Sequence, residues 1–391
     1  MRMTSVFVLA VTMAVVSMLS ACSAPAGDVG IDSSLRSRKV IKQPAKPQPA
    51  QTATKPVAVD PVIITVAPKV KPLFHSTVTF KPSVFPKPPD LPYAVPVAPA
   101  VILYETPFDP ELPRRGPHQI AGDPKFYEKF RDRVKQVVLT AIPDEKYDGL
   151  ALIDFESWHP LWMEPWHRPT TPGPWQEWMD YIAETHKDEV SKLDAAGLEM
   201  LWKSTYEEVA QKFWTSWIVW CKELRPNAKW SFYDVPNTVQ HGYGRTEPVF
   251  RFWGERNDRL AWLWKQVDFL APSLYCINKS VPKGVTPGPG EIVEGAYDSV
   301  ISSNMLECYR IGNGLPVYPF VWWRYHDNNP THGEKFINAY DLKTAMTLPL
   351  EYKAAGLILW DSIATKDQLD KTNDYIKESW NPVALDAQSL R

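Results

Sequence analysis

The sequence predicts an α/β protein in which residues 86–385 fold as a (β/α) barrel of TIM-like, distorted form. Short apolar runs that suit buried strands alternate along these residues with longer stretches whose apolar side chains recur every three or four positions, as on one face of a helix. The region is also long enough for such a barrel, which needs about 250 residues. Because alternating strands and helices pair in parallel through right-handed crossovers, we expect the sheet to close on itself.

Helices are expected wherever apolar residues recur at helical spacing. The clearest one spans 126–141 and stops before Pro143, and a longer one runs from about 193 to 224 and stops before Pro226. Further helices are expected from about 175 and at 257–267, 291–309, 341–353 and 368–380. The apolar runs between them are the expected strands, at 150–155, 230–233, 269–275, 315–322 and 356–360.

The amino terminus predicts export and lipid anchoring. Arg2 precedes an apolar run that is too short to span a bilayer comfortably, so residues 1–21 are expected to be a signal peptide. The run ends in LSAC at residues 19–22, which resembles the bacterial lipobox that is cleaved just before a diacylated cysteine. Acyl chains on Cys22 would anchor the protein in the bacterial cell envelope, at the outer membrane or the cell surface. The alternative is an ordinary signal peptide with a chance cysteine.

Residues 22–85 are expected to form a Pro-rich, disordered tether ahead of the barrel. Pro, Lys, Ala, Val, Thr and Gln dominate this stretch, which offers little apolar surface for a core. Because proline removes backbone donors and favours the extended polyproline conformation, the tether should be semi-rigid. Two short β-like pieces, 62–66 and 76–80, are compatible with either strand or linker.

Charge and residue spacing exclude several classes of function. The formal net charge is −2 and the basic residues are dispersed, so nothing favours nucleic acid as a partner. The eight histidines lack the close pairs that hold zinc, and Cys221, Cys276 and Cys308 have neither metal spacing nor a disulfide framework. We therefore expect no metal and no other cofactor. One disulfide among these cysteines is compatible with the sequence, and none is required.

Active sites of (β/α) barrels lie where the strands reach their carboxyl ends. In this sequence those ends carry aromatic and acidic residues, namely Asp154-Phe155-Glu156, Tyr233-Asp234, Ser273-Leu274-Tyr275, Trp322-Trp323 and Trp360-Asp361. The site is therefore expected to combine carboxylates with flat rings, which suits carbohydrate.

Two carboxylates at one strand end predict a particular division of work. Side chains alternate along a strand, so the same face should carry Leu150, Leu152, Asp154, Glu156 and Trp158. Such a pair approaches a substrate from one side, whereas most glycosidases place their two acids on opposite sides of the scissile bond. An adjacent pair can instead protonate the leaving oxygen with one acid and orient a nucleophile of the substrate itself, such as a 2-acetamido group, with the other.

Electrostatics supports this division, because two like charges in a partly dry pocket raise one pKa and leave the other group ionised. Glu156, nearer the rim, is expected to be the protonated general acid, and Asp154 to stay ionised beside the acetamido nitrogen. The alternative for an isolated Asp-x-Glu pattern is that both acids pair with Arg or Lys in an interior network.

The segment LALIDFESWHPLW resembles the hyaluronidase family of glycoside hydrolases, in which a hydrophobic run leads into Asp-Trp-Glu and then Trp-Arg-Pro. Four further segments resemble the family in the same order, ELRPNAKWSFYDVPN, NDRLAWLWKQVDFLAPSLY, LPVYPFVWWRY and AAGLILWDS. Five ordered matches are more specific than any single motif. The resemblance implies a retaining, substrate-assisted enzyme that cleaves β-linked N-acetylhexosamine in polysaccharides of hyaluronan or chondroitin type.

The resemblance also implies roles for individual residues. Glu156 would be the acid/base and Asp154 would position the acetamido group, while Tyr233 and Tyr275 would hydrogen-bond around the reacting sugar and Trp360 would shape the acetamido pocket. The substrate contacts implied are Ser273, Trp158, His159, Asn237 and Trp322, and Trp162, Trp166 and Trp323 are further candidates for stacking on sugar faces. For each ring the alternative is packing in the core.

Three departures from the family leave other functions open. The family's Trp-Arg-Pro is Trp158-His159-Pro160 here, so an arginine that could pair with a uronate is replaced. The family's Phe-Pro-Asp-Cys turn becomes Val-Pro-Asn-Thr, with Asn237 in place of the acid, and its first strand signature is barely kept at 92–96. The alternatives are a non-catalytic surface glycan-binding lipoprotein and a chitinase-like substrate-assisted hydrolase.

Overall fold

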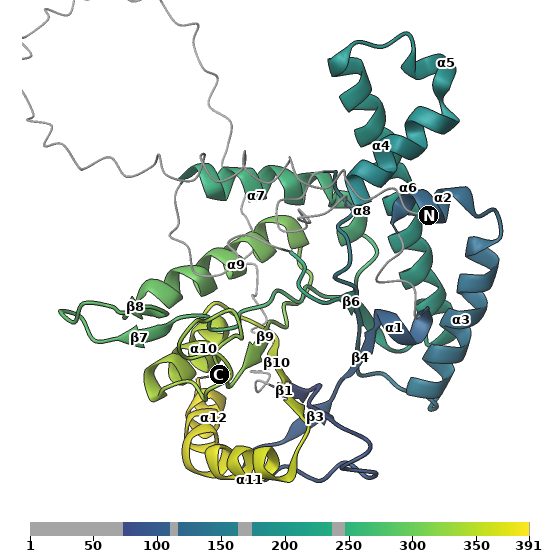
Figure 1. Cartoon of the computed structure of the whole chain (residues 1–391). Helices are drawn as coiled ribbons and strands as arrows, with labels where there is room; N and C mark the ends of the chain where they lie inside the picture. Colours follow the sequence, from purple (N-terminus) through teal and green to yellow (C-terminus); the bar gives the residue numbers. More distant parts are fainter. Residues whose placement is uncertain (1–72, 110–115, 163–173, 237–246, 391) are drawn as a thin grey trace, which may run out of the picture. The chain divides into compact units, whose positions relative to one another are not determined.

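The computed structural model describes residues 73–109, 116–162, 174–236 and 247–390, all of which belong to one compact unit, Thr65–Arg391 (Figure 1). The predicted signal peptide, the predicted lipid-attachment residue Cys22 and the predicted tether up to residue 72 lie outside the described residues. No helix in the described part of the chain is both long enough and apolar enough to cross a membrane.

Parallel strands in two sheets form the centre of the fold. One sheet has the order β3-β1-β10-β9 and the other the order β4-β5-β6. Their strands are β1 (Leu73–Ser76), β3 (Val97–Pro99), β4 (Val101–Tyr104), β5 (Leu150–Asp154), β6 (Lys229–Phe232), β9 (Phe320–Trp322) and β10 (Gly356–Trp360). Only Ala100 separates β3 from β4, so one continuous stretch of chain joins the two sheets.

The extended segment 268–275 bridges the remaining gap between β6 and β9. Its Ser273 pairs in parallel with Phe320 of β9, and the Asp268 N–H donates to a β6 carbonyl at 2.8 Å. The pairing is irregular because Pro272 has no N–H to donate. The strands and this segment thus follow one another around a distorted (β/α) barrel, which confirms the predicted fold class.

The barrel begins earlier than residue 86, the predicted boundary. β1 (Leu73–Ser76) lies in the range predicted as tether, yet it pairs with β10 on one side and with β3 on the other. β2 (Thr79–Phe80) pairs with β11 (Ser362–Ile363), and 92–96 is not a strand. β1 has only four residues in a proline-rich stretch, which is too short for alternation to predict a strand. Its partner β10 lies near the other end of the chain, so no local feature indicates the pairing.

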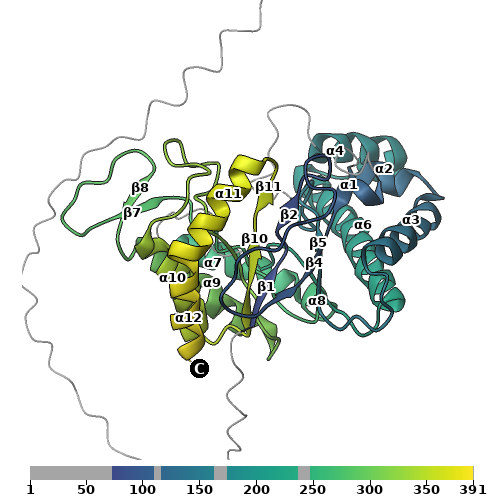
Figure 2. The same ribbon diagram turned by 90° about the horizontal axis from the view of Figure 1, so that it is seen from below.

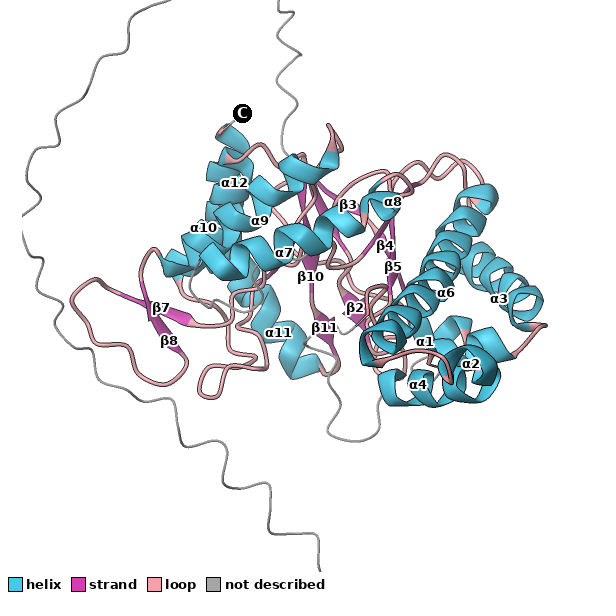
Figure 3. Ribbon diagram, turned by 90° about the horizontal axis from the view of Figure 1, so that it is seen from above, coloured by secondary structure: helices cyan, strands magenta, loops and turns pink. Residues whose placement is uncertain are grey.

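Helices pack outside the strands (Figures 2 and 3). α3 (Phe126–Ala141) and α6 (Ala195–Leu224) lie side by side next to β4 and β5, and both confirm helices predicted from apolar spacing. The other helices are α1 (Glu105–Phe108), α2 (Pro117–Gly122), α4 (Pro174–Thr185), α5 (Lys187–Val190), α7 (Glu247–Arg259), α8 (Ala261–Trp264), α9 (Ala296–Gly312), α10 (Ala339–Glu351), α11 (Lys366–Tyr375) and α12 (Asn381–Ser389), with a π-helical turn at Ile376–Trp380. α12 extends the fold past residue 385.

The helix predicted at 291–309 starts too early. Glu291–Val293 instead form β8, which pairs with β7 (Lys279–Val281). α9 begins only at Ala296 because the preceding Gly295 has a φ of 94°. Glycine enters this left-handed region without steric strain, so it ends the extended run and sets the start of the helix.

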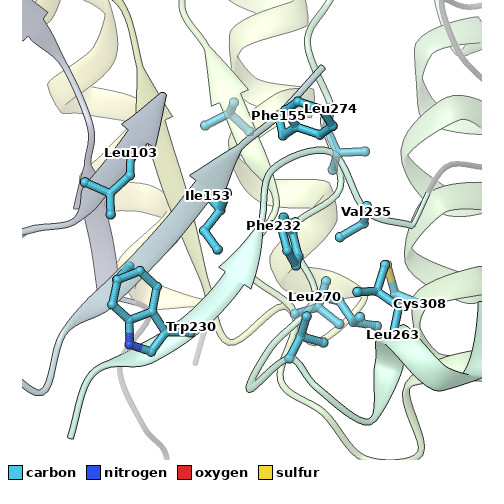
Figure 4. Packing of buried hydrophobic residues seen from close by; sticks show 14 of the residues in the cluster. Leu103, Ile153, Phe155, Trp230, Phe232, Val235, Leu263, Leu270, Leu274 and Cys308 are labelled. Atoms are coloured by element: carbon cyan, nitrogen blue, oxygen red, sulfur yellow. The ribbon is translucent and has the colours of Figure 1, made fainter. Parts of the chain in front are cut away.

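The two faces of β5 enter different clusters. Leu150 and Leu152 point inward and pack with residues of the facing strands, Phe269, Ala271, Phe320 and Ile358. Ala151 and Ile153 point outward into the large cluster beneath the helices, part of which Figure 4 shows. The predicted alternation along this strand is confirmed, and it directs the last residue, Asp154, to the inner side.

The three cysteines of the described residues are buried free thiols, Cys221, Cys276 and Cys308. Burial raises the pKa of each thiol well above its usual range, so they stay protonated. Within the described residues no group of His, Cys, Asp and Glu has the arrangement of a metal site.

Candidate active site

A cavity of about 390 Å³, here named the strand-end cavity, opens at the carboxyl ends of the barrel strands. Four of its wall residues end a strand, namely Tyr104 of β4, Asp154 of β5, Trp322 of β9 and Trp360 of β10. The others are Ile102, Glu105, Glu156, Tyr233, Tyr275, His326 and Asp327. The cavity occupies the position at which (β/α) barrels carry their active sites.

Asp154 and Glu156 both line this cavity. Asp154 is the last residue of β5, is 8% exposed and lies beside Tyr104 of β4, whereas Glu156 stands two residues further on and reaches solvent. Among the described residues, no lysine or arginine lines the cavity or forms an ion pair with either acid. The interior ion-pair network that the sequence left open is therefore not what surrounds this pair.

Burial raises the pKa of both acids. The pKa of Asp154 lies well above its usual range because of burial first, and then because of its contact with Glu156 and the charge of Glu105. Burial also raises the pKa of Glu156, but the hydrogen bond with Asp154 opposes that rise. Both acids therefore favour the protonated form more than a free carboxyl does, because burial disfavours charge on each of them and the two are in contact.

Two tyrosines line the same cavity as the acids. The ring centroids of Tyr233 and Tyr275 are 6.2 Å apart, and the Tyr233 hydroxyl donates to the Ser273 Oγ at 3.4 Å. Burial, followed by neighbouring carboxylate charge for Tyr233, holds the pKa of both phenols well above the usual range. Both rings therefore keep their O–H as donors, and Ser273 stands behind Tyr233 rather than on the cavity wall.

Hydrogen bonds fix the aromatic wall of the cavity. The Trp360 indole N–H donates to the Tyr104 hydroxyl at 3.0 Å, and the Trp322 indole N–H donates to Asp361 at 2.9 Å. The rings of Trp322 and Trp360 lie 4.8 Å apart at 79°, and Tyr275 contacts both. Asp361, an acid at a strand end, does not line the cavity but holds a ring that does.

Trp158 and His159, both expected at the substrate, lie outside the strand-end cavity. Regular strand geometry ends at Asp154, so the alternation that predicts Trp158 on the inner face no longer applies. Trp158 is 2% exposed, and its ring packs 5.1 Å from Phe155 and 5.2 Å from Phe213. His159 lines a separate pocket of about 10 Å³.

The other stacking candidates have different positions. Trp162 is 6% exposed and packs on Tyr206, and the Trp323 indole N–H donates to Asp361 at 2.7 Å in the interior. Trp166 and Asn237 lie outside the described residues. Of the described tryptophans proposed for stacking, Trp322 is the one that lines the cavity.

Sequence reasoning missed five residues of the cavity wall: Tyr104 and Glu105, His326 and Asp327, and the apolar Ile102. The apolar run VILY ends at Tyr104, so the same strand-end argument could have found the first two. His326 and Asp327 lie on the loop after β9, and no local sequence pattern indicates that this loop reaches the cavity. The His326 Nδ1 and the Asp327 Oδ1 lie 2.7 Å apart.

Comparisons with known proteins agree with this geometry. Hyaluronidase of Apis mellifera is 24% identical over 279 residues, which cover 68% of this chain and 65% of the relative. Hyaluronidase-1 of Homo sapiens is 25% identical over 271 residues, which cover 66% of this chain and 57% of the relative. The chain thus spans less than two thirds of the length of these relatives.

Solved structures show the same fold. The crystal structure of bee venom hyaluronidase superposes with a TM-score of 0.55 and 22% identity, covering 69% of this chain and 80% of that one. A second crystal structure of that enzyme, in complex with a hyaluronic acid tetramer, gives a TM-score of 0.54. A family model described as hyaluronidase matches residues 122–389, which contain Asp154, Glu156 and most of the barrel. The chain therefore belongs to the hyaluronidase family.

Proposed function

We propose that the protein is a glycoside hydrolase that cleaves β-linked N-acetylhexosamine polysaccharides of hyaluronan or chondroitin type, with retention and with assistance from the substrate. The observation that carries this proposal is the placement of Asp154 and Glu156 at one strand end, on one side of an aromatic-walled cavity. The substrate class is supported by the relatives, which are named hyaluronidases, one of them solved with a hyaluronic acid tetramer.

In the first step Glu156 gives its proton to the glycosidic oxygen as the bond to the anomeric carbon breaks. The acetamido oxygen of the same sugar forms the new bond to that carbon, which produces a cyclic oxazolinium ion. Its positive charge lies beside Asp154 and favours the ionised form of that acid.

In the second step Glu156 removes a proton from water, which attacks the anomeric carbon and opens the ring. Two inversions at one carbon give net retention. The hydroxyl of Tyr275, which stays protonated, donates a hydrogen bond toward the acetamido group, and Trp360, fixed by Tyr104, encloses it.

The proposed test uses polysaccharides that differ in one group. Hyaluronan, chondroitin and chitin oligosaccharides and their N-deacetylated forms are incubated with the full-length chain, and the products are analysed by mass spectrometry and by the anomer first formed. Cleavage should require the acetyl group and should release the β-anomer. Efficient cleavage of a deacetylated substrate, or release of the α-anomer, would show that the acetamido group is not the nucleophile.

The non-catalytic alternative rests on the departures at His159 and Asn237. His159 lies outside the strand-end cavity, so that departure leaves the two acids intact. We further propose that lipid on Cys22 anchors the protein in the bacterial cell envelope. Mass spectrometry of the mature amino-terminal peptide tests this proposal. An unmodified Cys22 in that peptide would show that the protein is not anchored through this residue.

A further inference from the structure

Asp361 is a buried acid that the proposed mechanism does not use. It directly follows Trp360 at the end of β10, is 1% exposed and does not line the strand-end cavity. Its Oδ1 accepts the Trp322 indole N–H at 2.9 Å, and its Oδ2 accepts the Trp323 indole N–H at 2.7 Å. The Arg324 Nε donates to both oxygens at 3.2 Å. One carboxylate thus accepts hydrogen bonds from three consecutive side chains.

Arg324 fixes this carboxylate to the rest of the barrel. Its guanidinium also donates to the Thr372 Oγ1 at 3.0 Å and to the Glu334 carbonyl at 3.1 Å, and its Cζ lies 4.3 Å from the centroid of the Phe336 ring. These contacts tie the arginine to α11 and to the segment 334–336. Because the acid and the base are each held from several sides, Asp361 presents its two oxygens to the indoles in a fixed position.

The ring of Trp322 connects Asp361 to the groups that meet the acetamido group in the proposed mechanism. Its centroid lies 5.7 Å from that of Tyr275 and 4.8 Å from that of Trp360, and the ring planes cross at 61° and 79°. In that mechanism Tyr275 donates a hydrogen bond toward the acetamido group and Trp360 encloses it. Trp323, which binds the same acid, is 2% exposed and does not line the cavity. The two neighbouring indoles therefore share one acceptor, but only the first contributes to the cavity wall.

We infer that Asp361 is a positioning residue, which acts through Trp322 to hold Tyr275 and Trp360 in the orientation that the attacking acetamido group needs. The inference rests on the proposed function. An acetamido oxygen attacks the anomeric carbon at a useful rate only when it is held close to that carbon and in line with the breaking bond. A small rotation of the aromatic wall should therefore slow the first step. A polysaccharide also binds through its other sugars, so KM should change less than kcat.

The test measures kcat and KM of the full-length chain on an N-acetylated polysaccharide that the wild type cleaves. It also measures the inhibition constant of a thiazoline analogue of the oxazolinium intermediate. Asp361→Ala removes both acceptors, so kcat should fall by about tenfold to a hundredfold and the analogue should bind more weakly by a similar factor. The inhibition constant is a property of folded molecules, so a loss of stability alone leaves it unchanged.

A matched pair of variants identifies the route by which Asp361 acts. Trp322→Phe and Trp323→Phe each keep a ring and remove one N–H donor to Asp361. In the Trp323→Phe protein, Asp361→Ala should lower kcat by the same factor as in the wild type. In the Trp322→Phe protein it should change kcat by about twofold or less, because effects that share one route are not additive. If Asp361→Ala does not fold, the pair alone decides, since only Trp322→Phe should lower kcat and weaken binding of the analogue.

The outcomes separate this inference from the proposed function. If the wild type cleaves acetylated substrates and Asp361→Ala leaves kcat and the inhibition constant unchanged, only the inference is overturned. An equal loss of kcat from Asp361→Ala in both phenylalanine variants, or from Trp322→Phe and Trp323→Phe themselves, also overturns it, since Asp361 would then not act through Trp322. If the wild type neither cleaves an acetylated substrate nor binds the analogue, the proposed function fails and the inference fails with it.

Discussion

Strand β5 separates two regions that are both rich in aromatic residues. On its inner side lies the strand-end cavity, where the indole N–H groups of Trp322 and Trp360 donate hydrogen bonds at 2.9 and 3.0 Å. On its outer side lies the outer aromatic cluster, which consists of Phe155, Trp158, Phe213, Trp214 and Trp217. Within the described residues the indole N–H groups of Trp214 and Trp217 have no hydrogen-bond partner.

The difference shows that the cavity depends on the orientation of its rings, whereas the outer cluster depends on the volume that its rings fill. In the cavity the indoles of Trp322 and Trp360 donate hydrogen bonds to Asp361 and Tyr104, and these bonds hold each indole plane in the cavity wall. In the outer cluster the rings pack closely, with centroids 5.1 to 5.6 Å from Phe155. Substitutions in the two regions should therefore change different quantities.

The largest effect is expected inside the cavity, for Glu156→Gln. Loss of the general acid should lower kcat by about a thousandfold or more while leaving oligosaccharide binding intact. The free energy of unfolding at neutral pH should stay the same or rise, because a carboxylate whose pKa burial has raised is removed from beside Asp154. Rates on an acetylated substrate, a binding titration and thermal unfolding check these points. Turnover near that of the wild type would refute the assignment of Glu156.

The opposite pattern is expected in the outer aromatic cluster, for Trp217→Ala. Trp217 is fully buried, so the cavity left behind should lower the free energy of unfolding by about 3–5 kcal/mol. The kcat of the remaining folded protein should stay close to that of the wild type. Trp220→Ala is the matched control on α6, since Trp220 is partly exposed and should matter less. A fall in kcat without loss of stability would mean that the two regions are not separate.

A smaller, pH-dependent effect is expected below the cavity at His75 of β1. Its ring lies edge-on against Tyr318, is 5% exposed, and has no partner for either nitrogen among the described residues. Burial lowers its pKa from 6.5 to about 4, so the folded state disfavours the protonated form that the unfolded chain adopts below pH 6.5. Stability is therefore complete above pH 6.5 and is lost as pH falls toward 4, by about 3 kcal/mol at most.

His75→Leu should remove this loss. The measurement compares the free energy of unfolding of the wild type and the variant from pH 7 to pH 4. Asp154 and Glu156 titrate in both proteins, so the difference between the two curves isolates His75. Parallel curves would show that His75 is not held neutral by burial.

Local spacing in the sequence was sufficient for the regular elements and for the centre of the site. The apolar periods of 126–141 and 193–224 correspond to α3 and α6, and the alternation along 150–154 places Leu150, Leu152 and Asp154 on one face. These predictions succeed because helix and strand geometry repeat over a few residues, so that neighbouring side chains alone determine the face on which each one lies.

The rest depended on contacts between distant parts of the chain. β1 is a strand because β10 and β3 pair with it, and Glu105 and His326 reach the cavity because separate strand ends converge there. The sequence also could not predict where the Trp158 side chain points, because alternation applies only as far as the end of β5. Beyond that point Trp158 packs against Tyr206 of α6. A sequence thus determines the faces of each element. Only the packing of distant segments decides which faces meet, because the free energy of that packing comes from apolar surface that those segments bury together.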